Sequence, residues 1–410
     1  MPAPALARVL ASDATALLLW QDGRTVRRPA VAPPERLQPG DLVREQAEDW
    51  AVVARPGADA LHPDGDLGRL LRDGARRDAA LRDRAALLQA IRADLDRRGF
   101  LEVETPAIAT SPGLELHLDA VGAALREGMA GAPVQRWLVT SPEYHCKRLL
   151  HAGLPRIYSL AKAFRSGERG GWHNPEFTML EWYRAGEDSG AIIADALRLL
   201  RRTAAAVERS RRARGDDRSV FRPSRALRLS FAGALRRFAG MEMNGRDGLP
   251  LPIATLRARA NAAGATIRPD DAEADVLLAV FAECVEPALT AHDVVVIERW
   301  PQSLASLARR LPDAPHLAER FEIYVRGVEL ANGFGELVDA DEQRQRFEAD
   351  LSARRARGLP IYPIDERFLD ALRRGCPPAS GVALGVDRLL MAVGGYDDID
   401  EVLAFPFERA

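Results

Sequence analysis

The chain has 410 residues, with 57 lysine and arginine side chains against 59 aspartates and glutamates, and 47% of its residues are hydrophobic. A chain of this size and hydrophobic content builds one large domain with smaller additions, which excludes wholesale disorder. The net charge of −2 argues against general nucleic-acid binding through a basic surface. No apolar run reaches the roughly 20 residues of a membrane span, and residues 1–13 lack the basic start of a secretory signal.

The three cysteines are far apart in the chain, at positions 146, 284 and 376. Such spacing builds neither a disulfide framework nor a zinc site. We therefore expect reduced thiols in a cytoplasmic protein that has no membrane partner.

Residues 1–60 differ from the rest of the chain in their sequence pattern. They predict a small β-rich module, which could be a reduced OB-like barrel. Short β-like runs alternate there with turn signals, at residues 8–10, 16–20, 25–28, 41–44 and 50–55. Asp22 and Gly23 lie between two of these runs, as a hairpin turn requires, and Pro33-Pro34 and Pro39-Gly40 break the chain again. A linker is expected at 61–74, before a larger domain at 75–410.

The larger domain opens with a predicted helix, in which helical spacing is kept by Leu81, Leu88, Ile91 and Leu95. Gly99 is placed to end this helix. Strands are predicted at 100–108 and 136–140. Ser141 and Pro142 then serve as the N-cap and the first residue of a second helix.

The remaining elements alternate irregularly between helices and hairpins. The pattern predicts a helix at 190–209, mainly helical structure at 231–290, a strand at 293–300, two strands at 321–337, a helix at 341–357 and a strand leading into a helix at 381–395. This order favours an α+β fold with an antiparallel or mixed sheet over a doubly wound parallel one. The basic run at 209–214 is expected to be a solvated surface, with a docking site for an acidic partner as the alternative.

Three segments carry candidate chemistry, and the first is the hairpin predicted at 156–183. Two apolar β-like runs flank a polar, glycine-rich loop there, with Arg165 at the end of the first run and Phe177 on the second. A guanidinium can grip a phosphate with its planar fork, and an aromatic face can stack on a base. A plain surface hairpin is the alternative.

The second segment, 320–337, predicts a pair of carboxylates. A two-residue turn at 326–327 pairs Tyr324 with Glu329. Glu322 then shares a face with Glu329, about 7–8 Å away on the diagonal. Two carboxylates at that distance can share a Mg²⁺ ion that bridges nucleotide phosphates. The alternative is the solvated face of a sheet whose other face is buried.

The third segment, 381–395, predicts a glycine-rich strand that runs into a helix. Gly381 and Gly385 interrupt the apolar strand, and Asp387 and Arg388 open the helix. Glycine in a strand often marks backbone that a ligand approaches, and an arginine at a helix start can reach a phosphate. Close packing of the strand is the alternative.

Taken in chain order, these segments resemble the motifs of class II aminoacyl-tRNA synthetases, and FLEVETP at 100–106 resembles the dimer-forming first motif. The detailed sequence of these segments narrows the resemblance to the lysyl branch of these synthetases. It most resembles the elongation factor P lysine ligases, paralogues of lysyl-tRNA synthetase that modify a protein lysine. The likeness covers residues 75–410 and is carried by TSPEYHCKRLL (140–150), HNPEFTMLEWYR (173–184), RFEIYVRGVELANGF (320–334) and GVALGVDRLLM (381–391).

The resemblance implies both fold and activity. The fold is a class II antiparallel sheet flanked by helices, in a domain that forms a homodimer. The activity is a two-step ligation. ATP activates a lysine-type amino acid as an aminoacyl-adenylate and releases pyrophosphate, and the adenylate then acylates a lysine side chain of elongation factor P. The groups implied are ATP, as a substrate, and Mg²⁺.

The resemblance also implies residue roles. Arg165 would contact the α-phosphate of ATP, and Arg388 the γ-phosphate while flanking the adenine. Further ATP contacts would be Ser166, Gly167, Glu168, Asn174, Phe177, Glu329, Leu330 and Gly385. Glu322 and Glu329 would hold Mg²⁺. A pocket for a cationic side chain needs carboxylates, and the implied amino-acid pocket consists of Ser141, Pro142, Glu143, Tyr183, Glu336 and Ala383.

Three departures from the family pattern bear on function. Gly167 stands where the second motif usually has glutamate, and Glu168 follows one residue later, which leaves the contact to the adenine or amino group open. Ala383 stands where lysyl-tRNA synthetases have glycine. A methyl in a tight pocket shifts preference by ~1–3 kcal/mol, which favours (R)-β-lysine over α-lysine. The module at 1–60 is much shorter than an anticodon-binding barrel, so tRNA is not an expected partner.

Two alternatives remain open on the sequence. One is a shortened lysyl-tRNA synthetase that charges tRNA. The other is a catalytically silent paralogue that binds an amino acid or a protein as a regulator. Gly167 keeps this second alternative open, and against it stands the presence of Arg165, Arg388, Glu322 and Glu329.

Overall fold

The computed structural model describes residues 6–12, 16–21, 24–29, 37–46, 49–57, 65–126, 128 and 131–410. The chain divides into two compact units, residues 1–86 with 400–405 and residues 87–399 with 406–410. Helix α1 (Asp66–Asp96) begins in the first unit and ends in the second. Within the described ranges, no helix is long and apolar enough to cross a bilayer.

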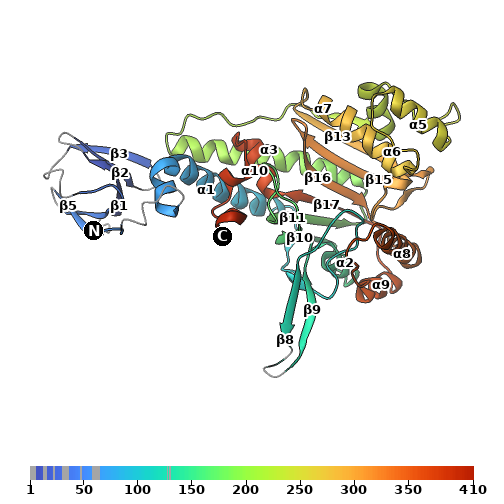
Figure 1. Ribbon diagram of the computed structural model, residues 1–410, viewed down its shortest axis with the longest axis horizontal. Helices are drawn as coiled ribbons and strands as arrows, with labels where there is room; N and C mark the ends of the chain where they lie inside the picture. The colour runs from blue at the N-terminus through green and yellow to red at the C-terminus, as the bar shows by residue number, and fades with distance from the viewer. Residues whose placement is uncertain are drawn as a thin grey trace. The chain divides into compact units, whose positions relative to one another are not determined.

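The first unit contains a five-stranded antiparallel sheet with the order β3-β2-β1-β4-β5 (Figure 1). Alternate residues such as Val9, Leu19 and Val43 are fully buried and form its core. The five predicted β runs are confirmed as β1 (Leu6–Ser12), β2 (Ala16–Gln21), β3 (Arg24–Pro29), β4 (Leu42–Gln46) and β5 (Asp49–Ala54).

Some expectations for the amino-terminal part fall outside the described residues. These are the turn at 22–23, the break at 33–34 and positions 61–64 of the linker. Positions 66–74 of that linker are helical, because α1 begins at Asp66. The domain limits placed at 60 and 75 stay predictions.

The predicted helix and its end are confirmed in α1. Leu88 is partly buried, whereas Ile91 and Leu95 are buried almost completely, as their helical spacing requires. Gly99 follows with a φ of 75°, the left-handed conformation that commonly ends a helix.

The second unit is built on a nine-stranded sheet with the order β12-β13-β15-β16-β17-β11-β10-β6, and β14 pairs with β15 outside this path (Figure 1). Its pairings are antiparallel except β12–β13 and β10–β6, which confirms the expected antiparallel or mixed sheet. The strands are β6 (Leu101–Glu102), β10 (Arg156–Phe164), β11 (Glu176–Ala185), β12 (Leu227–Ser230), β13 (Val294–Pro301), β14 (Arg310–Leu311), β15 (Ala314–Val325), β16 (Val328–Gly335) and β17 (Ala379–Gly385).

A separate three-stranded sheet, β7-β9-β8, contains a hairpin that projects away from the large sheet (Figure 1). Its strands are β7 (Ile108–Ala109), β8 (Gly122–Arg126) and β9 (Pro133–Leu138). The strand expected over 100–108 is therefore shorter than predicted, and only Leu101 and Glu102 join the large sheet, beside β10.

Helices cover the large sheet, and α3 and α10 pack against it and against each other. On β11, Tyr183 packs with Cys146 of α2, while Leu180 and Trp182 point to the opposite face and are fully buried. The helices are α2 (Glu143–His151), α3 (Ser189–Ala213), α8 (Ala340–Ala356), α9 (Glu366–Arg373), α10 (Val386–Gly394) and α11 (Ile399–Val402).

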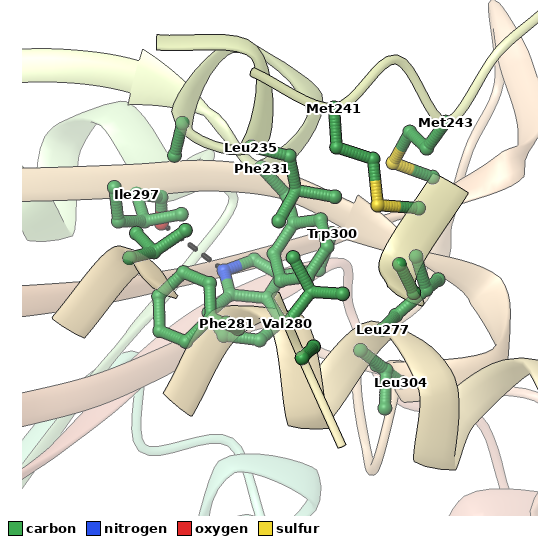
Figure 2. Packing of buried hydrophobic residues seen from close by; sticks show 14 of the residues in the cluster. Phe231, Leu235, Met241, Met243, Leu277, Val280, Phe281, Ile297, Trp300 and Leu304 are labelled. Carbon is green, nitrogen blue, oxygen red and sulfur yellow. Dashed lines mark hydrogen bonds between the residues drawn. The ribbon is translucent and has the colours of Figure 1, made fainter. Parts of the chain in front are cut away.

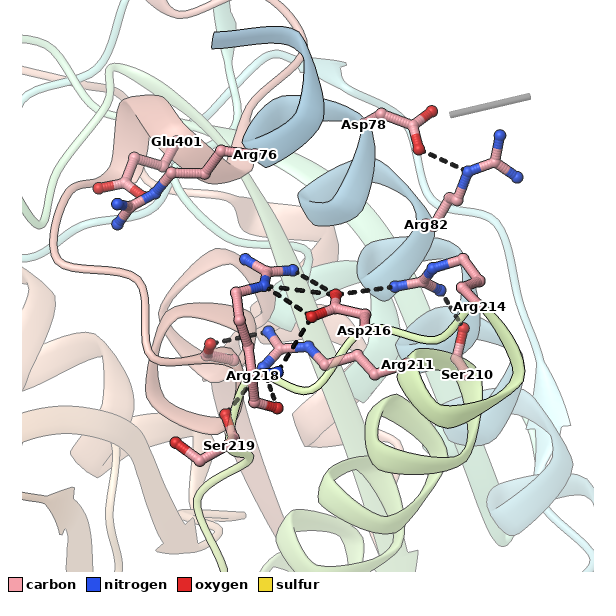
Figure 3. Close-up of polar contacts among 11 residues, drawn as sticks. Arg76, Asp78, Arg82, Ser210, Arg211, Arg214, Asp216, Arg218, Ser219 and Glu401 are labelled. Atoms are coloured by element: carbon pink, nitrogen blue, oxygen red, sulfur yellow. Dashed lines mark hydrogen bonds and ion pairs between the residues drawn. The ribbon is translucent and has the colours of Figure 1, made fainter. Parts of the chain in front are cut away.

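Helix α3 is longer than predicted and includes part of the basic run at 209–214. Arg211 is 1% exposed and donates hydrogen bonds to the carbonyls of Ser219 and Gly394, each at 2.8 Å. Figure 3 shows Arg211, Arg214 and Arg218 gathered around Asp216. The prediction that this run is a solvated surface is wrong at Arg211. Its guanidinium is buried and joins the end of α3 to the end of α10.

The segment 231–290 is mainly helical, as predicted, and packs around an aromatic cluster (Figure 2). Phe231 stacks on Phe281 with ring centroids 5.2 Å apart, and Trp300 lies against both. The Trp300 indole N–H donates to the carbonyl of Ile297 at 3.2 Å, so its polar atom is satisfied. The elements are α4 (Phe231–Ala234), α5 (Ile253–Ala262), α6 (Glu273–Val280), α7 (Glu286–Leu289) and two π-helical turns, η3 (Leu235–Ala239) and η4 (Phe281–Val285).

This cluster gives a stability prediction. We expect Phe281→Ala to lower the free energy of unfolding by about 3–5 kcal/mol, because it leaves a cavity between two packed rings. Leu249→Ala is the control, since Leu249 is 53% exposed and its loss should change stability by less than about 0.5 kcal/mol. Urea unfolding followed by tryptophan fluorescence measures both. Equal effects of the two substitutions would contradict a core role for the cluster.

Candidate active site

A cavity of about 420 Å³ lies in the second unit, over one face of the large sheet. It brings together most of the site residues predicted from the sequence, although these come from segments far apart in the chain. The predicted residues that line it are Ser141, Glu143, Arg165, Glu168, Asn174, Phe177, Glu322, Glu329, Leu330, Ala383, Gly385 and Arg388.

The other predicted site residues do not line this cavity. Pro142 directly precedes α2, and Gly167 makes a turn with a φ of 81°. Ser166 donates its backbone N–H to the carbonyl of Asp119 at 2.7 Å. Tyr183 and Glu336 are buried beside the cavity, with 2% of each exposed.

A larger hollow of about 1100 Å³ lies elsewhere on the unit, and no predicted site residue lines it. Its walls include residues 104–106 of FLEVETP together with Arg148 and Asp370. The smaller cavity is therefore the candidate site, because it gathers the guanidinium and carboxylate groups that nucleotide chemistry requires.

The predicted hairpin at 156–183 forms from β10 and β11 and places Arg165 against Phe177. The guanidinium carbon of Arg165 lies 5.2 Å from the centre of the Phe177 ring. The Arg165 backbone N–H donates to the carbonyl of Pro175 at 2.9 Å, which fixes where the strand ends. An ion pair with Glu168 at 3.5 Å keeps the guanidinium at the cavity wall.

Arg388, in the first turn of α10, ties three segments together at the cavity. Its Nη1 donates to the carbonyl of Glu329 at 2.8 Å, and its Nε donates to the carbonyl of Trp172 at 3.3 Å. Its Nη2 lies 2.6 Å from His173 Nε2. A guanidinium can only donate, so this ring nitrogen accepts. Burial, with Arg388 adding to it, lowers the pKa of His173, which keeps the imidazole neutral.

The turn between β15 and β16 has the predicted form, but the register beyond it shifts. Arg326 and Gly327 have φ values of 50° and 82°, as in a type I′ turn, and Tyr324 pairs with Glu329. A bulge between Ile323 and Tyr324 then leaves Leu330 as an extra residue on β16. Leu330 is buried and lines the cavity, and Glu322 and Glu329 still reach the same cavity.

Glu322 is buried and held by its neighbours on β15. Its carboxylate accepts hydrogen bonds from Arg320 and from the hydroxyl of Tyr324. Burial raises the pKa of Glu322 to about 7, Arg320 opposes the rise, and Glu329 adds to it. Two repelling carboxylates facing one cavity fit a divalent cation with oxygen ligands. Within the described ranges, no group of three or more histidine, cysteine or acidic side chains is placed to hold a metal ion.

A buried acidic group, Glu181, lies beside the predicted amino-acid pocket. Ser141 Oγ donates to its Oε1 at 2.5 Å, and the Tyr183 hydroxyl donates to its Oε2 at 2.6 Å. Burial raises the pKa of Glu181 to about 8, and the nearby carboxylate of Glu143 adds to the rise. The sequence interpretation missed Glu181, although alternation from Phe177 along β11 puts both side chains on one face.

Lys147 is a second residue that the sequence interpretation missed. It lies on α2, one turn after Glu143, and forms ion pairs with Glu143 and with Glu336, whose Oε2 is 2.6 Å from its Nζ. The spacing of Glu143 and Lys147 on a helix was a signal for their pairing. Glu336, which follows β16, was predicted as a pocket residue, but no local pattern in the sequence indicated that it pairs with Lys147.

The sheet register connects the two ends of the cavity. Glu181 pairs with Ala383 across β11 and β17, Ala383 pairs with Asn332 on β16, and Asn332 pairs with Glu322 on β15. Since neighbouring strands lie about 4.8 Å apart, this row spans about 14 Å between the backbones of Glu181 and Glu322. Ala383 therefore lies between the acidic pocket and the pair of carboxylates.

Arg354 of α8 holds the segment 115–119 against the cavity. Its fully buried guanidinium donates to the carbonyls of Glu115 and Leu118 at 2.8 and 3.0 Å, and pairs with the Asp119 carboxylate at 2.5 Å. It also lies over the ring of Tyr362, 4.9 Å from its centre. Burial raises the pKa of Glu115, which lines the cavity, to about 7.

Further lining residues were not predicted individually. Several lie inside the quoted motif segments, so their position in those segments was the available signal. They are Glu115, His117, Leu118, Trp172, His173, Met179, Arg320, Ala331, Asn332, Phe334, Asp387 and Ile399.

Comparison with known proteins identifies the family. Residues 70–409 match the family model described as tRNA synthetases class II (D, K and N). The elongation factor P–(R)-β-lysine ligase of Edwardsiella ictaluri is 41% identical over 341 residues, which covers 81% of this chain and 96% of that protein. The protein of the same name from Erwinia tasmaniensis is 40% identical over 333 residues, with the same coverage. The chain therefore belongs to the class II tRNA synthetases (D, K and N), and its resemblance to the elongation factor P lysine ligases is confirmed.

Proposed function

We propose that this chain activates a lysine-type amino acid, (R)-β-lysine, with ATP and transfers it to a lysine side chain of elongation factor P. The observation that carries the proposal is the cavity itself. Two guanidinium groups, Arg165 and Arg388, share it with the carboxylates of Glu322 and Glu329 and with the acidic pocket at Glu143. The names of the two relatives support the same reaction.

In the proposed complex, ATP occupies the cavity between Arg165 and Arg388. Arg165 contacts the α-phosphate, Arg388 contacts the γ-phosphate, and Phe177 stacks on the adenine. Glu322 and Glu329 would hold Mg²⁺, which supplies positive charge against the phosphates. The contact between the Arg165 guanidinium and the Phe177 ring supports this placement of ATP, because it puts a group that can bind phosphate beside a ring that can stack on the base.

The reaction then runs in two displacements. The amino-acid carboxylate attacks the α-phosphorus, and the bond to pyrophosphate breaks to give the aminoacyl-adenylate. The ε-amino nitrogen of the acceptor lysine attacks the acyl carbon, loses its proton, and AMP leaves. Catalysis consists of positioning and of charge stabilisation by Arg165 and Arg388, without a covalent enzyme intermediate.

The remaining parts of the proposal concern assembly and location. A cytoplasmic homodimer is proposed, formed through the FLEVETP segment. Exposed apolar side chains at Leu101, within this segment, and at Ile108, just after it, support an interface there. tRNA is not proposed as the acceptor.

The test of the function is pyrophosphate exchange into ATP. We expect exchange with (R)-β-lysine, weaker exchange with α-lysine, and none without amino acid. Incubation with purified elongation factor P should then add one β-lysyl mass, whereas tRNA should take up no label. Charging of tRNA instead would favour a shortened lysyl-tRNA synthetase, and no exchange with either amino acid would favour a silent regulatory paralogue.

A second prediction concerns Arg388. Arg388→Ala should raise the KM for ATP by about tenfold or more, because a hydrogen bond to a charged group contributes about 1.5–3 kcal/mol. The matched control is Arg212→Ala, since Arg212 is an exposed arginine that pairs with Glu208 on α3. Initial-rate kinetics of exchange measure both variants. An unchanged KM and kcat in the Arg388 variant would remove this residue from the ATP site.

A third prediction concerns Ala383. Ala383→Gly should shift preference towards α-lysine by about 1–3 kcal/mol in relative kcat/KM, because it removes the methyl that crowds an α-amino group. The comparison variant is Ala379→Gly, which removes a fully buried methyl from the same strand without touching the cavity, whereas Ala383 is partly buried at the cavity wall. The ratio of kcat/KM for (R)-β-lysine and α-lysine measures the effect. If both glycine variants changed the ratio equally, the methyl at 383 would have no part in selectivity.

A further inference from the structure

Lys147 is a buried lysine in a chain that contains only one other, Lys162. Its side chain is 2% exposed. A lysine in such a place is retained only when its charge is paired. The Lys147 ammonium forms ion pairs with two carboxylates from different parts of the chain, Glu143 on α2 and Glu336 after β16.

Each of these carboxylates is engaged through one oxygen. Glu143 uses Oε1 and Glu336 uses Oε2 to contact the Lys147 ammonium. The other oxygen of each accepts no hydrogen bond from any residue that the structure describes. Glu143 lines the cavity, and Glu336 Oε1 lies 2.7 Å from where a Cβ on Gly381 would be. Lys147 therefore orients both groups and leaves each with an oxygen for another donor.

The charge balance of this region depends on Lys147. Burial alone would lower the pKa of Lys147, but Glu143 and Glu336 outweigh it, so its pKa stays above the usual value. Burial raises the pKa of Glu336 to about 7, and Lys147 opposes that rise. The other titratable or charged groups that face this cluster are Glu115, Tyr144, Cys146, His151, Glu181, Tyr183, Arg309 and Cys376.

We propose that Lys147 is a positioning residue for amino-acid recognition. Its ammonium fixes one oxygen of Glu143 and one of Glu336, so that their other oxygens accept from the ammonium groups of a diamino acid. Selectivity for a cationic side chain over a neutral one depends on this internal cation. The inference rests on the proposed function, since it concerns the substrate pocket of that reaction.

The experiment compares Lys147→Met, Lys147→Arg and the matched control Lys162→Met. Lys162 is half exposed and pairs with Glu176 at 3.1 Å, outside the cavity. Pyrophosphate exchange gives KM for (R)-β-lysine and for ATP at pH 7 and pH 9. Calorimetry measures binding of (R)-β-lysine and of 3-aminohexanoic acid, the β-amino acid that lacks the side-chain ammonium, and thermal melting checks the fold.

At pH 7 we expect Lys147→Met to raise KM for (R)-β-lysine by about 10- to 100-fold and to leave KM for ATP unchanged. Burial raises the pKa of Glu336 and Lys147 opposes that rise, so without the internal cation the Glu336 carboxyl keeps its proton at pH 7 and loses it as the pH rises. The ammonium of the substrate, with an ordinary pKa of about 10.4, is still charged at pH 9. The defect should therefore shrink at pH 9, Lys147→Arg should retain most of the affinity, and Lys162→Met should match the parent protein.

Two results would overturn the inference. One is an unchanged preference for (R)-β-lysine over 3-aminohexanoic acid in Lys147→Met at both pH values. The other is a loss that affects ATP and both amino acids equally and does not depend on pH, which would mark Lys147 as a structural residue only. If the parent protein bound (R)-β-lysine but gave no exchange, the proposed reaction would fail while the calorimetric comparison still decided the role of Lys147.

Discussion

The site depends on carboxyl groups that are held in buried positions. Glu181, Glu322 and Glu336 are all buried, and a buried carboxylate is stable only when donors or cations face it. Glu181 accepts from two hydroxyl groups. Glu322 pairs with Arg320, and Glu336 pairs with Lys147. These partners fix the orientation of the three carboxyl groups around the cavity.

The sheet delivers these groups to one cavity through its register. The cross-strand row from Glu181 through Ala383 and Asn332 to Glu322 crosses four strands, of which only β15 and β16 are neighbours in the chain. One end of the row is acidic and suits an ammonium group, and the other end suits a metal-bound phosphate. The scissile centre of an aminoacyl-adenylate lies between its amino acid and its nucleotide. A single face of the sheet can therefore hold both halves of such an intermediate.

What the sequence predicted and what it missed have separate physical origins. Local rules predicted the hairpin pairing of Tyr324 with Glu329, because a two-residue turn determines its neighbours. The bulge that frees Leu330 depends on packing around β16, so no local pattern announces it. The pairs Lys147–Glu336 and Arg354–Asp119 join elements far apart in the chain. Such contacts are decided by tertiary packing, which a single sequence does not display.

Gly381 and Ala383 illustrate how little space there is for side chains along β17. A Cβ at Gly381 would lie 2.7 Å from Glu336 Oε1 and closer still to the Tyr183 ring, so glycine is required there by side-chain packing, not by a ligand. Two residues on, Ala383 faces the cavity and carries the methyl that Gly381 lacks. The first position keeps Tyr183 and Glu336 in contact with the strand. The second places a methyl at the cavity wall, so a change of one carbon atom at this position alters the shape of the cavity.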